Sequence, residues 1–127
     1  PAVADWLRFH TGCPIVTEPD EAAFALASDA AQMPVLTAFA KGSADYPDRS
    51  TTLIVAIDTF DGPEMLTLKG PGIRDTTHLS PHPLPIGFAG QAAANHALFP
   101  RGVDMLFVTA GKLAALPRST RITTQGA

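Results

Sequence analysis

The sequence predicts a single α/β domain built around a mixed β-sheet. Residues 51–60 and 103–108 are rich in β-branched and other apolar side chains, which is typical of buried strands. Residues 86–98 are rich in alanine and indicate a helix. Residues 64–69 alternate in polarity and follow a turn, which indicates a hairpin with the strand at residues 51–60. The apolar residues 113–116 follow a second turn and indicate a hairpin with residues 103–108, so the sheet cannot be wholly parallel.

The elements in the first quarter of the chain are predicted to be short. Residues 2–9 place apolar side chains on one side of a helix, which Gly12 and Pro14 end. Ile15-Val16 is predicted as a short strand. Residues 24–27 are apolar and fit either a strand or a helix, and their periodicity leaves both alternatives open.

Polar and proline-containing segments separate the remaining elements. Asp29 is placed to cap a helix over residues 30–40, which Pro34 interrupts. Residues 42–50 are polar and predict a loop. Residues 74–85 contain three prolines and predict an irregular segment before the alanine-rich helix.

Length and composition exclude several classes of protein. With 127 residues, 46% of them hydrophobic, the chain is expected to form one domain over residues 1–127 with a buried core. Its longest apolar run, residues 53–57, is far too short to cross a bilayer, so no membrane association is predicted. Because Cys13 is the only cysteine, no internal disulfide can form, and a cytoplasmic protein is expected.

The net charge of −3 hides an asymmetry along the chain. Residues 1–68 hold three cations and ten anions, which gives −7, whereas residues 69–127 hold six cations and two anions, which gives +4. The acidic total and the lack of a basic-aromatic motif argue against nucleic-acid binding. The later part either presents a basic face to an anionic ligand or an acidic protein, or is neutralised by the earlier part after folding.

Two segments of the basic part carry candidate ligand-binding groups. Gly70-Pro71-Gly72 follows a predicted strand and offers backbone N–H groups to an anion, although a purely structural turn explains the same residues. Arg118 and Arg121 flank Ser119 and Thr120. Their guanidinium and hydroxyl donors suit a phosphate or phosphonate, or alternatively a docking edge for another protein.

No catalytic site is predicted from the residues. Asp104 precedes a buried strand, where it can pair with Arg101, cap a turn or act as a catalytic carboxylate, and a structural role is favoured. No nucleophile–base pattern is present in the sequence. His78 and His82 have a spacing that suits a metal on a helix, but Pro81 lies between them and disfavours that helix. Neither a metal nor a cofactor is therefore predicted.

Four segments, in register over nearly the whole chain, resemble the PhnH family, one of the components of the bacterial carbon–phosphorus lyase system. They are Leu7–Thr11, Thr67–Ile73, Phe99–Asp104 and Leu116–Thr120. Members of that family have a further N-terminal segment, so the resemblance implies that this chain is N-terminally incomplete.

The resemblance also implies a fold and a role. The fold would be a three-layer α/β domain similar to the large domain of pyridoxal-phosphate-dependent transferases, without the cofactor. The role would lie in phosphonate catabolism, as a homodimeric subunit without catalytic residues that assembles with subunits G, I and J. Such a subunit supports the transfer of an alkylphosphonate onto a nucleoside triphosphate.

Two functional hypotheses remain open at this point. In the first, the chain is an accessory subunit whose basic C-terminal loops serve docking. In the second, it binds a phosphonate or a nucleotide directly, through Gly70-Pro71-Gly72, Arg101 and Arg118, and so contributes to an active site.

Overall fold

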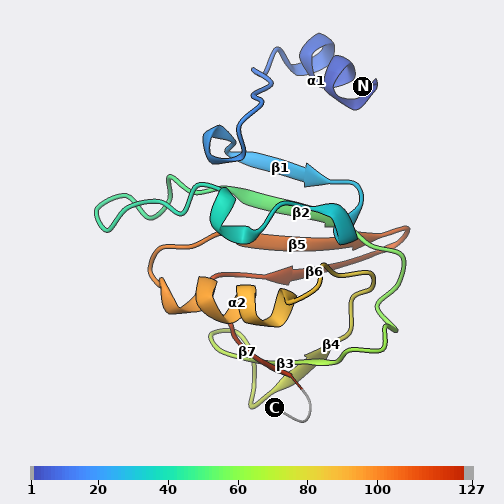
Figure 1. The fold of residues 1–127 in the computed structure, drawn as a ribbon, viewed down its shortest axis with the longest axis vertical. Coiled ribbons are helices and arrows are strands. Elements are labelled where there is room, and N and C mark those ends of the chain that lie inside the picture. Colours follow the sequence, from blue (N-terminus) through green and yellow to red (C-terminus); the bar gives the residue numbers. More distant parts are fainter. Residues whose placement is uncertain (1, 125–127) are drawn as a thin grey trace.

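The computed structural model describes residues 2–124 (Figure 1). Within them lie two α-helices, α1 (Ala2–Thr11) and α2 (Phe88–Ala97), and three single 3₁₀ turns, η1 (Pro19–Glu21), η2 (Ala30–Gln32) and η3 (Leu36–Ala38). The strands are β1 (Phe24–Ala27), β2 (Thr52–Ala56), β3 (Leu66–Lys69), β4 (Thr77–Leu79), β5 (Asp104–Thr109), β6 (Lys112–Leu116) and β7 (Arg121–Thr124). The predicted mixed α/β fold is confirmed.

The larger sheet has four strands in the order β1-β2-β5-β6. Strands β1, β2 and β5 are parallel, and β6 runs antiparallel to β5 through a tight turn at Gly111. The predicted hairpin between the last two of these strands is therefore confirmed. The ambiguous residues 24–27 form a strand, because their backbone pairs with β2 along the edge of the sheet.

The smaller sheet is antiparallel, with the order β4-β3-β7. The prediction that residues 64–69 pair with the strand at 51–60 is wrong, because β2 has β1 on one side and β5 on the other. Instead β3 pairs with β4 and β7. Residues 74–85 are thus less irregular than predicted, since they contain β4, and β7 was not predicted at all.

Two other predicted elements in the first third of the chain are absent from the described structure. Residues 30–40 form the separate turns η2 and η3 instead of one helix, with Pro34 in the extended segment between them. The Asp29 cap is confirmed, because its carboxylate accepts a hydrogen bond from the Ala31 N–H at 3.2 Å. Ile15 and Val16 belong to an irregular segment instead of a strand.

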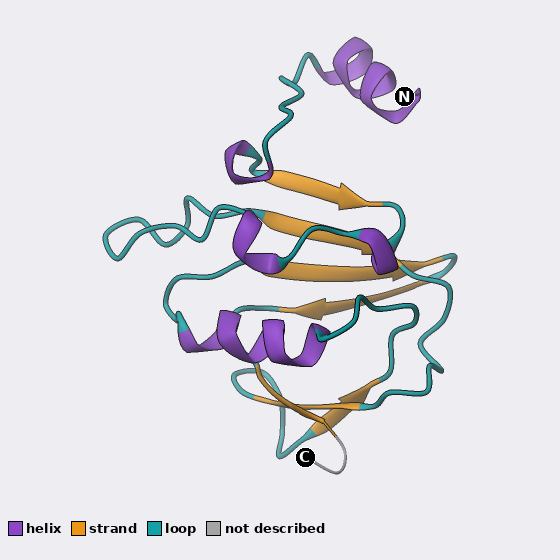
Figure 2. Ribbon diagram, viewed as in Figure 1, coloured by secondary structure: helices purple, strands orange, loops and turns teal. Residues whose placement is uncertain are grey.

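The hydrophobic core lies on one face of the larger sheet. Side chains alternate along β2 and β5, so that Leu53, Val55, Met105 and Phe107 are buried on this face. Helix α2 and the turns η2 and η3 cover it (Figures 1 and 2). Phe88 of α2 meets Phe107 edge to face, with ring centroids 6.0 Å apart.

A third layer, as the resemblance implied, is not found among residues 2–124. Helix α1 is set apart from the sheets (Figure 1) and buries none of its residues. In Figure 2 the helical segments that lie on the larger sheet are all on its core face. Within the described chain no helix has the length and apolar character needed to cross a membrane.

The opposite face of the larger sheet is apolar and open. Leu26, Ile54, Leu106 and Ala115 follow one another in register across all four strands. Three apolar side chains on this face are more than half exposed, Phe24 at 73%, Leu113 at 66% and Leu26 at 54%. We define the open face by the large apolar residues that share it, Phe24, Leu26, Ile54, Leu106, Val108 and Leu113.

Candidate functional site

Asp104 and Arg118 form an ion pair at the start of β5. The Arg118 Nη2 lies 2.8 Å from Asp104 Oδ2, and its Nε donates to Oδ1 at 3.1 Å. The backbone N–H of Arg118 donates to the same Oδ1 at 2.8 Å. Of the alternatives left open for Asp104, pairing with Arg101 is wrong, because Arg118 occupies its carboxylate.

The rest of the Arg118 guanidinium is also used inside the chain. Its Nη1 donates to the carbonyl oxygens of Pro47 at 2.6 Å and Pro100 at 3.4 Å, and its Nη2 donates to the Ser50 hydroxyl. The side chain is only 13% exposed. Arg118 therefore joins the loop at residues 42–50 to the start of β5, and its donors face the protein.

The Asp104–Arg118 pair predicts a pH dependence of stability. Partial burial by itself raises the pKa of Asp104, but the hydrogen bonds and positive charge of Arg118 outweigh burial and hold this pKa below its ordinary value of 3.8. Because the pKa of Asp104 is lower in the folded state than in the unfolded state, its ionisation stabilises the fold above pH 3.8. This stabilisation is lost as the pH falls through the pKa of the folded state.

We expect Asp104→Asn to have a lower free energy of unfolding than the wild type at neutral pH. The difference between the two proteins, here called the stability gap, is expected to become smaller in acid. Urea unfolding of both proteins at a series of pH values measures this gap. A gap that stays constant from neutral pH down to about pH 3 would contradict the assigned ion pair.

Asn95 connects the end of α2 to the strand that follows it. Its Oδ1 accepts from the Val103 N–H at 2.8 Å, and its Nδ2 donates to the Val103 carbonyl at 2.9 Å. Gly102 lies against this amide, and a Cβ there would be 3.0 Å from Asn95 Oδ1 at a φ of +136°. A glycine is therefore required at this close approach.

A cavity of about 300 Å³ opens where β3 ends and β7 begins. It brings together three residues singled out from the sequence, Gly70, Ser119 and Arg121. The other lining residues are Lys69, Pro71 and His96. Two separate sequence motifs thus meet at one place, because β3 and β7 are neighbours.

The other sequence candidates lie outside this lining. Arg101 is exposed at the turn after α2, and Gly72 has open space around it. Thr120 is buried, with its N–H bonded to the Pro117 carbonyl at 3.0 Å. Asp104 and Arg118 form the internal pair described above.

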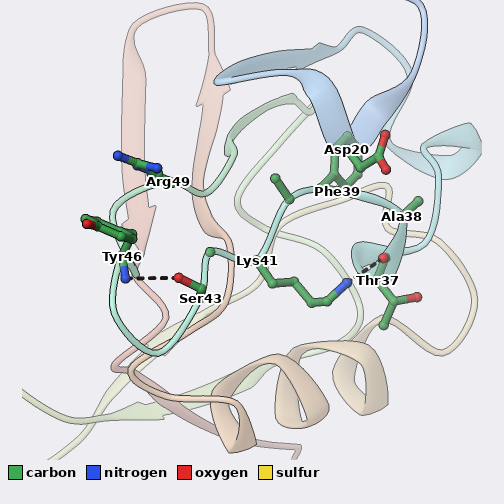
Figure 3. A pocket seen from close by; sticks show the side chains of 10 residues that line it. Asp20, Thr37, Ala38, Phe39, Lys41, Ser43, Tyr46 and Arg49 are labelled. Atoms are coloured by element: carbon green, nitrogen blue, oxygen red, sulfur yellow. Dashed lines mark hydrogen bonds between the residues drawn. The ribbon is translucent and has the colours of Figure 1, made fainter.

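A second cavity, of about 660 Å³, lies beside the loop at residues 42–50 (Figure 3). Lys41 Nζ donates to the Thr37 carbonyl at 3.0 Å, and the Arg49 guanidinium lies 4.0 Å from the centre of the Tyr46 ring. Asp20 adds a carboxylate, so that the lining carries charges of both signs. Sequence reasoning missed this cavity, since it predicted residues 42–50 only as a loop.

The chain is similar in sequence to bacterial proteins of phosphonate metabolism. Residues 1–123 match the family described as "Bacterial phosphonate metabolism protein (PhnH)". The chain is 39% identical over 117 residues to the "Alpha-D-ribose 1-methylphosphonate 5-triphosphate synthase subunit PhnH" of Rhizobium meliloti (strain 1021), a match that covers 92% of this chain and 58% of that protein.

A second relative belongs to another bacterium. The chain is 34% identical over 86 residues to the "Putative C-P lyase subunit protein HtxG" of Stutzerimonas stutzeri, covering 68% of this chain and 44% of that protein. The chain therefore spans about half the length of the curated relatives it matches.

Proposed function

This chain belongs to the PhnH family of bacterial phosphonate metabolism proteins, and from that premise we propose that it is an accessory subunit of a carbon–phosphorus lyase complex. Both relatives are described as subunits, one of a synthase and one of a C-P lyase. The partners in this proposal are the subunits G, I and J. The complex would transfer an alkylphosphonate onto a nucleoside triphosphate.

The open face is the observation that carries this proposal. It is a continuous apolar surface that crosses four strands, whereas on the other face of the same sheet Leu53, Val55, Met105 and Phe107 of the two central strands are buried in the core. Contiguous apolar surface of this kind is a mark of protein–protein contact. A subunit that acts by docking needs such a surface.

The environment of Arg118 changes which surface is proposed for docking. Basic C-terminal loops were the first expectation, but the Arg118 guanidinium is bonded within the chain. Replacing Arg118 would therefore disturb the fold as well as any interface. Arg121 remains exposed and stays available at the surface.

We expect the double variant Leu26→Lys with Leu113→Lys to fold normally and to lose its place in the complex. Both side chains lie on the open face, on the edge strands β1 and β6, where a lysine can reach water. Co-purification with tagged subunits G, I and J measures assembly, and circular dichroism checks folding.

The matched control is Val35→Lys with Ile86→Lys. These two residues are also more than half exposed, but neither belongs to the larger sheet: Val35 directly precedes η3 and Ile86 lies two residues before α2. The control is expected to assemble like the wild type. If the Leu26 and Leu113 variant still co-purifies in full amount, the open face is not the docking surface.

Two finer expectations stay predictions within this proposal. One is the similarity of the fold to the large domain of pyridoxal-phosphate-dependent transferases, and the other is a homodimer. Light scattering of the purified chain measures its molar mass and so tests the homodimer directly.

A further inference from the structure

We propose that the free edge of β1 binds an extended segment of a partner subunit, which joins the larger sheet as a further strand. The bound segment has an apolar centre with basic residues on either side of it. The inference rests on the proposed function, because the partner is one of the subunits with which this chain would assemble. It goes further in stating how that partner is recognised, by backbone hydrogen bonds at a sheet edge as well as by side chains on the open face.

The first argument is the direction of the backbone groups along β1. The Thr52 N–H donates to the Ala23 carbonyl at 2.8 Å, and Phe24 is the residue that pairs with Thr52 in the parallel register. The backbone groups of successive residues in a strand point alternately to one side and to the other. Those of Ala23 face β2, so the N–H and C=O groups of Phe24 and Leu26 point away from it.

These outward backbone groups have no partner within the described chain. Strand β1 is the outermost strand of its sheet, and helix α1 lies apart from it (Figure 1). Among residues 2–124, no loop, turn or side chain forms a hydrogen bond with the backbone of Phe24 or Leu26. Two N–H and two C=O groups, at the spacing of an extended strand, are therefore left for water or for another chain.

The second argument is that β1 lacks the features that protect the other sheet edges. Exposed edges of soluble proteins are usually short, or carry charged residues, prolines or bulges. The edge strands β6 and β7 each begin with a cation, Lys112 and Arg121, and β4 has only three residues. Strand β1 has no charge or proline, an unbroken register with β2 and exposed side chains at Phe24 and Leu26. A regular apolar edge of this kind is the surface to which an extended peptide adds.

The third argument is charge, which favours a partner over a second copy of this chain. Exposed carboxylates lie at both ends of β1, with Glu18 and Glu21 before it and Asp29 after it. None of the three forms an ion pair within residues 2–124. Pairing of β1 with β1 of a second copy would place carboxylates beside carboxylates whichever way the two strands ran, and this repulsion opposes self-association. A segment with basic residues on either side of its apolar centre matches the edge instead.

The charge of the bound segment is tested with Glu18→Gln and Glu21→Gln combined in one variant. At low ionic strength this variant is expected to bind tagged subunits G, I and J more weakly than the wild type, and the difference is expected to disappear at high salt. The matched control, Asp61→Asn with Glu64→Gln, makes the same change of net charge in the connection between β2 and β3. It is expected to bind like the wild type. Equal weakening in both double variants, or none in either, would overturn the basic segment.

The edge itself is tested by comparing Leu26→Pro with Leu26→Ala in the same binding measurement. Both variants lose the leucine side chain, but only proline also removes the outward N–H. Because this N–H has no part in the pairing of β1 with β2, both variants are expected to fold, which circular dichroism checks. We expect Leu26→Pro to bind at least about fivefold more weakly than Leu26→Ala. Equal binding by the two variants would overturn the inference and leave docking by side chains alone.

Amide hydrogen exchange of the wild type gives a readout that needs no variant. The amides of Phe24 and Leu26 are expected to exchange rapidly in the chain alone and at least about tenfold more slowly in the assembled complex. Assembly without this protection would overturn the inference and leave the proposed function intact, whereas a wild type that does not assemble would contradict both. Protection in the chain alone would show that this chain or a second copy already covers the edge, and would also overturn the inference.

Discussion

Replacing Arg118 by methionine is expected to lower the free energy of unfolding by about 2–3 kcal/mol. The substitution keeps most of the apolar stem and removes the guanidinium, leaving the half-buried Asp104 carboxylate without its partner. It also removes the hydrogen bonds to the carbonyls of Pro47 and Pro100, and so releases the loop at residues 42–50. Urea unfolding followed by circular dichroism measures the change.

Arg121→Met is the control for this prediction. Arg121 is a nearby arginine of the same type, but it is exposed and makes no ion pair within residues 2–124. Its replacement is expected to change stability by no more than about 0.5 kcal/mol. If Arg118→Met were as mild as this control, Arg118 would not be the internal connection described here.

Replacing Asn95 by alanine is expected to cost about 2–3 kcal/mol. Val103 is fully buried, and the substitution leaves both its N–H and its carbonyl without the partners that Asn95 supplies at 2.8 Å and 2.9 Å. Buried backbone groups without partners carry most of this cost, since water cannot replace the lost amide. The same urea measurement gives the change.

Ala94→Ser is the control for Asn95, because it lies on the exposed side of the same helix. It is expected to stay within about 0.5 kcal/mol of the wild type. If the unfolding midpoint of Asn95→Ala matched that of Ala94→Ser, the stabilising role assigned to the Asn95 hydrogen bonds would be contradicted.

Local signals in the sequence predicted the local parts of the fold. The β5–β6 hairpin has an apolar strand, a turn with Gly111 and a second apolar strand, all within a short stretch. The helices α1 and α2 were predicted for similar reasons. The error at residues 30–40 also has a local cause, because Pro34 stops the helix instead of only interrupting it.

Pairing between distant strands could not be predicted from these signals. The alternating polarity of β3 fits a hairpin with β2 as well as it fits the observed pairing with β4 and β7. In the structure, however, both edges of β2 are paired, with β1 and β5. Strand β7 is short and follows a polar loop, so its pairing with β3 gave no signal of its own. That pairing nevertheless brings Lys69 beside Arg121.

The same limit applies to the candidate residues. Gly70, Ser119 and Arg121 were recognised separately, and only the pairing of β3 with β7 places them around one cavity. Arg118 was recognised as a ligand candidate, but its partners Pro47 and Ser50 lie 71 and 68 residues away in the sequence. Whether a guanidinium faces a ligand or the protein depends on such distant contacts.

Co-expression of this chain with subunits G, I and J, followed by size-exclusion chromatography with light scattering, tests the proposed accessory role most directly. We expect co-elution at the mass of a stoichiometric complex. A parallel experiment with the Rhizobium meliloti relative, of which this chain covers 58%, serves as the positive control. If the relative assembles while this chain elutes alone, the open face of this chain is not sufficient for docking and the proposed role is contradicted.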